Sequence, residues 1–291
     1  MIYQHPLAYL LGLEGLALLR AWAGEYDREF VEARLAEVRR LLDTPELAHH
    51  PGVPVVRGDV ATGYRCWAGS YDAGRNSLFD LDEPVVHEIL AGLPAGAALD
   101  AACGTGRFAE HLVAQGHRVV GVDSSPEMLD RARTRVPAAE FRPGDLRRLP
   151  LPDAAVDVVT CGLALCHLPD LGPVLAELAR VLRPGGHLVI SDVHHERIFL
   201  GSVARAPGPA GEPGLAATYR HTPGAYLRAA LPAGFAVRRC AEPVGSPEPA
   251  AEPEVGTWPQ WPWSLMTLVP EAARAAVAVP SVIVWHFERV P

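Results

Sequence analysis

The chain of 291 residues is long enough for one large catalytic domain or two small ones. Its 49% hydrophobic and 21% charged residues exclude a disordered, collagen-like or small disulfide-rich protein. The formal net charge of −8 argues against a broad nucleic-acid surface, which needs many cations to neutralise phosphates, so a small molecule is the expected partner.

No membrane span, secretion signal or metal site is expected. The apolar residues 7–19 are interrupted by Glu14 and two glycines and fall short of the roughly 20 residues that cross a bilayer. No basic segment precedes them. The five cysteines form no CxxC pair and have no Cys/His metal spacing, which favours reduced thiols. We therefore predict a cytoplasmic protein, monomeric or homodimeric, that binds no membrane, nucleic acid or metal.

Residues 1–82 are predicted to form a helical and aromatic lid. The first 45 residues indicate two helices, and the second places Val31, Leu35, Val38 and Leu42 on one face. That face packs against the rest of the protein or forms a dimer seam, and the sequence leaves both open. Residues 44–82 are rich in turn formers but hold aromatic residues that are expected to cover a site: Tyr64, Trp67, Tyr71 and Phe79.

From residue 83 onward short apolar runs alternate with helical stretches, which is the pattern of βαβ units and a parallel sheet. A helix is expected over 83–93. The sequence Arg-Pro-Gly-Gly at 183–186 ends a helix and turns into the next strand. The expected strands are 97–101, 118–122, 140–141, 156–161 and 187–191, with helices near 106–114, 126–135 and 171–182 between them.

The alternation weakens after residue 191. Two stretches without periodicity, 204–214 and 242–254, are expected to be surface loops. Between and after them we expect a helix over 223–231, a strand over 235–239 and a terminal strand over 281–290.

A glycine-rich loop follows the first strand of the predicted sheet, with the sequence Asp-Ala-Ala-Cys-Gly-Thr-Gly at 100–106. Its glycines let the backbone approach a ligand at the start of a helix. The pattern Gly104-x-Gly106-x-x-Ala109, with Asp123 downstream, also fits a dinucleotide fingerprint. Asp100 separates the two interpretations, because a carboxylate there repels a pyrophosphate but attracts the ammonium and sulfonium of S-adenosylmethionine.

A third acidic residue, Asp145, lies at the end of the third predicted strand, beside Asp123 if the sheet has the usual winding. A carboxylate there accepts a hydrogen bond from an adenine amino group. Strand-end aspartates also cap helices or close turns. Three of them at three consecutive strand ends favour a binding site.

These residues lie in four motifs in which the chain resembles the class I S-adenosylmethionine-dependent methyltransferases of small molecules. The motifs are D-x-x-C-G-T-G at 100–106, V-x-G-V-D-x-S at 119–125, G-D-L-x-x-L-P at 144–150 and L-R-P-G-G-x-L-V-I-S-D at 182–192. The resemblance implies an α/β fold with a doubly wound, mostly parallel seven-stranded sheet, an antiparallel terminal strand and an N-terminal helical lid. It also implies one cofactor-binding domain at 83–291, with 195–233 and 242–280 as insertions beside the methyl acceptor.

The resemblance implies the site residues as well. The loop at 100–106 would hold the methionine part of the cofactor, Asp123 the ribose hydroxyls, and Asp145 with Leu146 the adenine. The segment 161–167 would lie over the methionine end. The predicted cofactor-binding residues are Tyr71, Asp100, Ala102, Cys103, Gly104, Thr105, Gly106, Asp123, Ser124, Met128, Asp145, Leu146, Cys161 and His167.

Methyl transfer to an oxygen of a small molecule, in secondary metabolism, is the expected reaction. Nitrogen and carbon acceptors are less favoured, because an imidazole suits an acidic hydroxyl near neutral pH. The chain lacks Asn/Asp-Pro-Pro-Tyr/Phe after the fourth strand, which disfavours amino-group methylation of DNA or of a protein glutamine. The candidate bases are His167, His194, His195 and His221. The candidate substrate-binding residues are Tyr64, Trp67, Trp258 and Trp261, of which the tryptophans line an acceptor pocket or cover the edge of the sheet.

Two other functions stay open on the sequence alone. A protein of the same fold that binds S-adenosylmethionine but rearranges or cyclises its substrate would carry the same motifs. An NAD-dependent oxidoreductase would share the glycine-rich loop, and the position of Asp100 argues against it.

Overall fold

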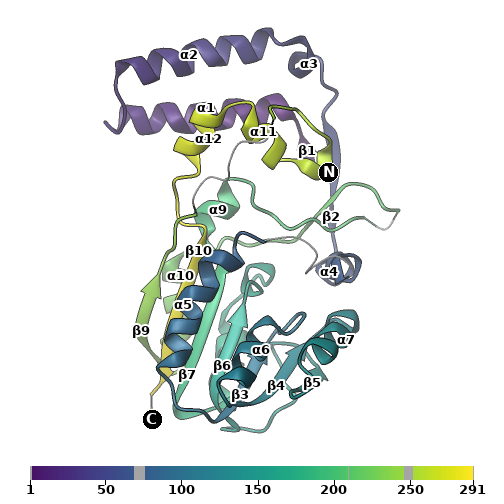
Figure 1. Cartoon of the computed structure of the whole chain (residues 1–291), viewed down its shortest axis with the longest axis vertical. Helices are drawn as coiled ribbons and strands as arrows, with labels where there is room; N and C mark the ends of the chain where they lie inside the picture. Colours follow the sequence, from purple (N-terminus) through teal and green to yellow (C-terminus); the bar gives the residue numbers. More distant parts are fainter. Residues whose placement is uncertain (1, 69–75, 209, 246–251, 291) are drawn as a thin grey trace.

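The protein is described by a computed structural model that covers residues 2–68, 76–208, 210–245 and 252–290, without the side chain of Trp67. Figure 1 shows two layers along the long axis, a strand-rich body and a set of helices beyond the upper ends of its strands. The N-terminus lies with these helices, and the C-terminus lies at the far end of the body.

The body contains a seven-stranded sheet in the order β5-β4-β3-β6-β7-β10-β9. The first five strands of this order are parallel, and β10 is antiparallel to both of its neighbours. The predicted α/β fold with a mostly parallel seven-stranded sheet is therefore confirmed. The strands are β3 (Ala97–Ala101), β4 (Arg118–Asp123), β5 (Glu140–Pro143), β6 (Val156–Gly162), β7 (Leu182–Val193), β9 (Phe235–Ala241) and β10 (Val282–Arg289).

Helices cover both faces of this sheet. Buried residues of the central strands, such as Leu99 and Val158, pack into one apolar cluster on each face, which explains the continuous apolar runs in the sequence. One cluster includes α8 (Gly172–Val181) and α10 (Pro223–Ala230), and the other includes α5 (Phe79–Ala91), α6 (Arg107–Ala114) and α7 (Pro126–Arg135).

The strand β7 begins five residues before the predicted start at His187. Val156 of β6 pairs with Leu182, and Val158 pairs with His187, so residues 183–186 bulge out between two paired positions. Gly185 takes a φ of +78° in this bulge, a conformation that glycine adopts without a steric cost. The predicted turn is therefore present as an irregularity within one long strand.

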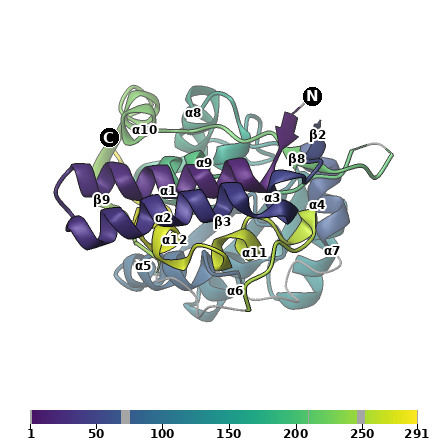
Figure 2. The ribbon, with the colours of Figure 1, turned by 90° about the horizontal axis from the view of Figure 1, so that it is seen from above.

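A third apolar cluster, separate from the sheet, holds together the helices beyond the upper strand ends. We call these helices the lid. Chain segments from both ends meet there, because Leu10, Leu13 and Leu41 are buried together with Trp261 and Leu265. The lid consists of α1 (Pro6–Trp22), α2 (Arg28–Asp43), α3 (Pro45–Ala48), α11 (Trp263–Thr267) and α12 (Pro270–Ala276). Figure 2 shows α1 and α2 running side by side across the body, with α11 and α12 beside them.

The apolar face predicted on α2 is only partly buried. Leu35 and Leu42 are 42% and 50% exposed, whereas the neighbouring Leu41 is fully buried against the lid. A dimer seam on this face stays a prediction, and Leu35 and Leu42 are not buried against the rest of the described chain. The reason is that α1 packs against the side of α2 that carries Phe30, Arg34 and Leu41.

A small three-stranded sheet connects the lid with the body. The strand β2 pairs antiparallel with β1 and parallel with β8. After β2, the helix α4 (Val60–Ala68) reaches α7 of the body through an ion pair of 3.5 Å between Arg65 and Glu127. Within the residues described, none of the helices has the length and apolar character needed to cross a membrane. The small strands are β1 (Ile2–Gln4), β2 (Val53–Gly58) and β8 (Gly214–Ala216).

Candidate functional site

The glycine-rich loop joins β3 to α6 at the edge of the sheet where the parallel strands end. Ala102, Gly104 and Gly106 all have positive φ angles, of 55°, 52° and 87°. The left-handed conformation costs a non-glycine residue such as Ala102 of order 1 kcal/mol, and strain of this kind clusters at functional sites. A Cβ atom at Gly104 would meet nothing within 4 Å, so the loop backbone faces open space at that residue. The predicted cradle therefore has the form of a ligand-binding loop.

Asp123 ties the end of β4 to this loop. Its Oδ2 accepts a hydrogen bond of 2.8 Å from the Gly104 amide, and its Oδ1 accepts one of 2.8 Å from the Ser125 amide. Burial raises the pKa of Asp123, and these amides oppose that shift. Each carboxylate oxygen has a second lone pair. Asp123 is thus fixed in place with acceptor capacity left for the ribose hydroxyls of the predicted cofactor.

The residues predicted beside Asp123 occupy different environments. Ser124 is exposed, whereas Met128 is 1% exposed and belongs to the interior beneath the loop. Thr105 is also buried, at 2% exposure, and Cys103 is 7% exposed.

Asp100 is buried, and each of its carboxylate oxygens accepts a hydrogen bond from within the protein. Its Oδ2 accepts from the Ala109 amide at 2.9 Å, and its Oδ1 accepts from the Thr160 hydroxyl at 2.9 Å. Burial raises its pKa to about 7, in spite of these hydrogen bonds. Asp100 therefore holds the start of α6 to β6, and its direct contact with the cofactor's ammonium stays a prediction.

Replacing Asp100 with asparagine is expected to remove part of the pH dependence of stability. Because its pKa is raised on folding, Asp100 retains a proton between about pH 4 and 7 that the unfolded chain releases, so stability falls as the pH rises through this range, by up to about 1.4 kcal/mol per pH unit. Urea unfolding of wild type and Asp100→Asn between pH 4.5 and 7.5 measures the difference. If the free energy of unfolding depends on pH equally in the two proteins, the raised pKa of Asp100 is contradicted. The comparison also cancels the contribution of Glu14, whose pKa burial likewise raises to about 7.

Asp145 lies close to Asp123 but faces solvent. The Gly144 amide donates to the Asp123 carbonyl at 3.0 Å, which places the two acidic residues at adjacent strand ends. Arg147 forms an ion pair of 2.6 Å with Asp145 and lowers its pKa to about 2. Asp145 is therefore a permanent acceptor, which suits the predicted contact with the adenine amino group. Leu146 packs partly buried against the core of the body.

The segment after β6 turns back over the edge of the sheet. Cys161 is fully buried, and Leu163 has a positive φ of 54° while its amide donates to the Ser191 carbonyl at 2.8 Å. A short 3-10 helix, η1 (Leu165–His167), follows and carries His167.

His167 is held by a partner at each ring nitrogen. Its Nδ1 lies 2.9 Å from the Ala217 carbonyl, and its Nε2 lies 2.8 Å from the hydroxyl of Tyr64 in α4. A carbonyl oxygen only accepts, so the proton is assigned to Nδ1 and the Tyr64 hydroxyl donates to Nε2. The structure therefore brings Tyr64, from the segment before the body, into contact with His167 of the body. The unprotonated Nε2 of His167 faces the Tyr64 hydroxyl.

The other three candidate histidines have structural partners or burial. His194 accepts the Glu196 amide at its Nδ1 and bonds Glu242 at its Nε2, at 3.3 and 3.0 Å, and so caps the short helix α9 (His195–Phe199). His221 donates from Nε2 to the Leu168 carbonyl at 2.8 Å. Burial lowers the pKa of His195. His167 is the candidate whose unprotonated nitrogen meets a hydroxyl group.

The two predicted tryptophans near the C-terminal end of the chain, Trp258 and Trp261, lie with the lid. Trp261 is 6% exposed within the lid and donates to the Val255 carbonyl, whereas Trp258 donates to Gln4 of β1 at 2.8 Å. Both therefore stabilise the lid. Tyr71 and the side chain of Trp67 lie outside the described residues.

Two buried aspartates at the same edge were not assigned a role from the sequence. Asp192, at the end of β7, accepts from the Tyr226 hydroxyl at 2.8 Å. Asp82 of α5 forms an ion pair with Arg107 at 2.7 Å and accepts from the Ser191 hydroxyl at 2.6 Å. Both tie helices to β7. The strand-end position of Asp192, directly after buried Ile190 and Ser191, was the available sequence signal.

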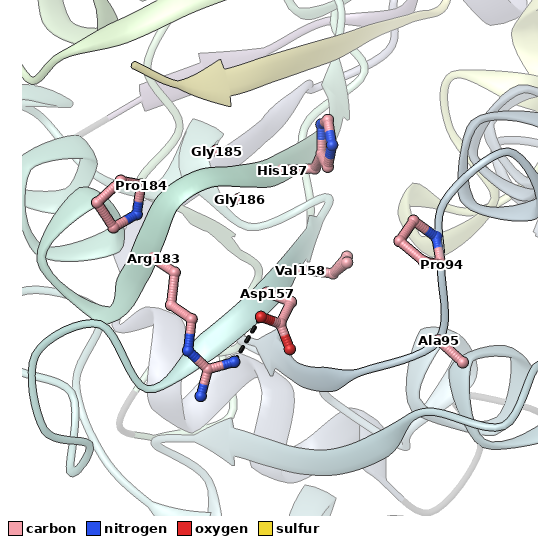
Figure 3. A pocket seen from close by; sticks show the side chains of 9 residues that line it. All are labelled: Pro94, Ala95, Asp157, Val158, Arg183, Pro184, Gly185, Gly186 and His187. Atoms are coloured by element: carbon pink, nitrogen blue, oxygen red, sulfur yellow. Dashed lines mark hydrogen bonds and ion pairs between the residues drawn. The ribbon is translucent and has the colours of Figure 1, made fainter. Parts of the chain in front are cut away.

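A surface cavity of about 370 Å³ lies at the opposite edge of the sheet. It is lined by the starts of β6 and β7, including Asp157, Arg183 and His187, and Figure 3 shows the ion pair between Asp157 and Arg183 in its wall. Because the glycine-rich loop follows the carboxyl end of β3, this cavity is distinct from the predicted cofactor site.

Comparison with known proteins gives a match in the middle of the chain. Residues 99–190 match the profile described as a methyltransferase domain. The chain therefore carries a methyltransferase domain, and the match covers less than half of the chain's length. Among solved structures, an S-adenosylmethionine-dependent methyltransferase from Mesorhizobium loti superposes with a TM-score of 0.51 and 24% identity, over 71% of this chain and 96% of that one. This likeness shows the fold.

Two curated relatives share the methyltransferase domain more closely in sequence. A malonyl-[acyl-carrier protein] O-methyltransferase from Serratia marcescens is 41% identical over 132 residues, which are 45% of this chain and 51% of the relative. A demethylmenaquinone methyltransferase from Deinococcus radiodurans is 45% identical over 109 residues, 35% of this chain and 45% of the relative. The chain thus spans about half the length of these curated relatives.

Proposed function

We propose that the protein transfers a methyl group from S-adenosylmethionine to an oxygen atom of a small molecule. The proposal rests on the position of Asp123. Its carboxylate accepts a hydrogen bond from the Gly104 amide, and the residue is only partly buried at the edge where the parallel strands end. One of the two relatives described above is named an O-methyltransferase, which supports oxygen as the acceptor atom.

The residues at this edge fit the cofactor. The open space at Gly104 admits a ligand against the loop backbone, Asp123 offers acceptors to ribose hydroxyls, and Asp145 offers a charged acceptor to an adenine amino group. When bound, S-adenosylmethionine supplies a methyl group on a positively charged sulfur. Positioning of the acceptor supplies much of the acceleration in such a displacement.

His167 is the residue that we assign to proton removal. Its Nε2 is the acceptor for the Tyr64 hydroxyl, so an acceptor hydroxyl that takes the place of this hydrogen bond delivers its proton to the same nitrogen. The Ala217 carbonyl at Nδ1 fixes the tautomer and stabilises the resulting cation. Tyr64 thus orients the ring before the acceptor arrives.

The test is a time course with a panel of hydroxylated small molecules and methyl-labelled S-adenosylmethionine. We expect one S-adenosylhomocysteine for each methylated product. His167→Ala is expected to lower kcat by about a hundredfold. His49→Ala, in an exposed residue at the end of α3, is the matched control. Substrate conversion without S-adenosylhomocysteine would overturn the proposal.

A further inference from the structure

The buried arginines of this protein differ in what neutralises them. Arg107 pairs with Asp82 at 2.7 Å and with Glu83 at 3.2 Å. Arg34 pairs with Glu14 at 3.2 Å. Arg197, in α9, is also largely removed from solvent, yet it forms no ion pair or side-chain hydrogen bond with the residues that the structure describes. A buried charge without a partner is costly, so its retention calls for a functional explanation.

Arg197 lies where the lid meets the body. Figure 1 shows α9 above the upper ends of β7 and β10 and below the lid helices α1 and α12. The Trp263 ring of α11 lies 5.5 Å from the Arg197 guanidinium carbon. The Tyr9 hydroxyl of α1 is buried without a hydrogen-bond partner, and so is the Nε of Arg197. The Tyr9 ring lies beside Gly201, four residues after Arg197, and the positive charge of Arg197 opposes the rise that burial causes in the pKa of Tyr9.

Structural roles account for another partly buried arginine but not for Arg197. Arg205 donates to the carbonyls of Trp258 and Trp261 and thereby holds the lid to the segment after α9. Among the residues that the structure describes, the Arg197 side chain contacts the Trp263 ring, and such a cation–π contact is worth about 0.5–2 kcal/mol. The Arg197 Nε and the Tyr9 hydroxyl therefore remain as two donors without an acceptor, and the positive charge of Arg197 has no carboxylate partner among the described residues.

We propose that Arg197, together with the Tyr9 hydroxyl, binds a carboxylate group of the methyl acceptor. Guanidinium and phenol donors match the two oxygens of a carboxylate, and the negative charge supplies the missing counterion. α9 begins three residues after Asp192 and therefore at the same edge of the sheet as the segment that carries His167. The inference rests on the proposed function and names its substrate class, a hydroxylated carboxylic acid.

The carboxylate held by Arg197 is the recognition group and not the methylated oxygen. Hydrogen bonds to a guanidinium occupy the lone pairs of the carboxylate and reduce its nucleophilicity. The reacting oxygen is a separate hydroxyl, whose proton goes to His167 and whose new bond forms to the transferred methyl as the bond from that methyl to sulfur breaks.

The first test measures binding of benzoate, benzamide and phenyl phosphate by calorimetry, without turnover. We expect saturable benzoate binding to wild type and at least tenfold weaker binding to Arg197→Gln, with partial recovery in Arg197→Lys. Benzamide should also bind at least tenfold more weakly than benzoate. Arg39→Gln is the matched control, because Arg39 is exposed on α2. Equal binding of acid and amide, no benzoate binding, or a preference for phenyl phosphate would overturn the proposal.

The second test is thermal unfolding of the same variants without ligand. Removing an uncompensated buried charge should raise the Tm of Arg197→Gln by about 2 °C, as expected when a binding residue is retained at the expense of stability. Arg39→Gln should leave the Tm unchanged. A lower Tm in Arg197→Gln would show a structural role and overturn the proposal. Benzoate binding that depends on Arg197 in a protein without methyl transfer would instead overturn the proposed function alone.

Discussion

Replacing Asp123 with alanine is expected to weaken binding of S-adenosylmethionine by more than tenfold, which corresponds to about 1.4 kcal/mol or more. Two effects combine in this variant. The ribose hydroxyls lose a charged acceptor, and the Gly104 and Ser125 amides lose the carboxylate that fixes the loop. Calorimetric titration measures the change directly.

Two further variants test whether the loss of cofactor affinity comes from the Asp123 carboxylate itself. Asp123→Asn keeps one acceptor oxygen and is expected to bind with intermediate affinity. Asp130→Ala removes an exposed aspartate from α7, which follows β4, and should bind like wild type. Unchanged affinity in a correctly folded Asp123→Ala protein would refute the assignment of Asp123 to the cofactor.

Deleting residues 1–44 is expected to abolish turnover while the seven-stranded sheet stays folded. The lid has its own apolar cluster, whose buried residues include none from the strands of that sheet. The deletion removes α1 and α2 and with them Tyr9, but leaves the glycine-rich loop and Asp123 in place. Circular dichroism and cofactor titration of the truncated protein report on the sheet, and the methyl-transfer assay reports on the lid.

The same deletion uncovers Leu265 and Val269, which pack in the lid. A full-length Leu10→Ala variant is therefore measured beside it, because Leu10 is fully buried there and its truncation loosens the lid without exposing α11 or α12. We expect reduced turnover with unchanged cofactor affinity. Full activity of the truncated protein would contradict a role for the lid.

The sheet was predictable because its strands are buried on both faces. Residues such as Leu99, Val159 and Ile190 are fully buried, so each central strand appears as a short continuous apolar run between helices. The glycine-rich loop was predictable for a similar reason, since its positive φ angles restrict the residue types that fit. Local constraints of this kind leave a direct signal in the sequence.

The second sheet and the composition of the lid were not predictable in this way. The strands β1 and β8 have three residues each. Pairing with β2 stabilises β1 across about 50 residues of chain and β8 across more than 150. In α12 the buried residues are alanines, which let α1 approach closely but give little contrast between apolar and polar faces. These contacts depend on the assembled fold.

The candidate site was predictable in position but not in detail. The sequence placed Asp100, Asp123 and Asp145 at one edge, but it did not show that Thr160 and Ala109 occupy the oxygens of Asp100 or that Arg147 pairs with Asp145. Arg197 was missed, because the lack of a carboxylate partner is a property of its surroundings in space.

Calorimetric titration of the purified protein with S-adenosylmethionine, S-adenosylhomocysteine and NAD identifies its cofactor. We propose that a cofactor with an adenosine and a methionine part binds at the edge that carries Gly104 and Asp123. We predict micromolar binding of both sulfur compounds and no binding of NAD. Binding of NAD alone, or of none of the three, would contradict the account.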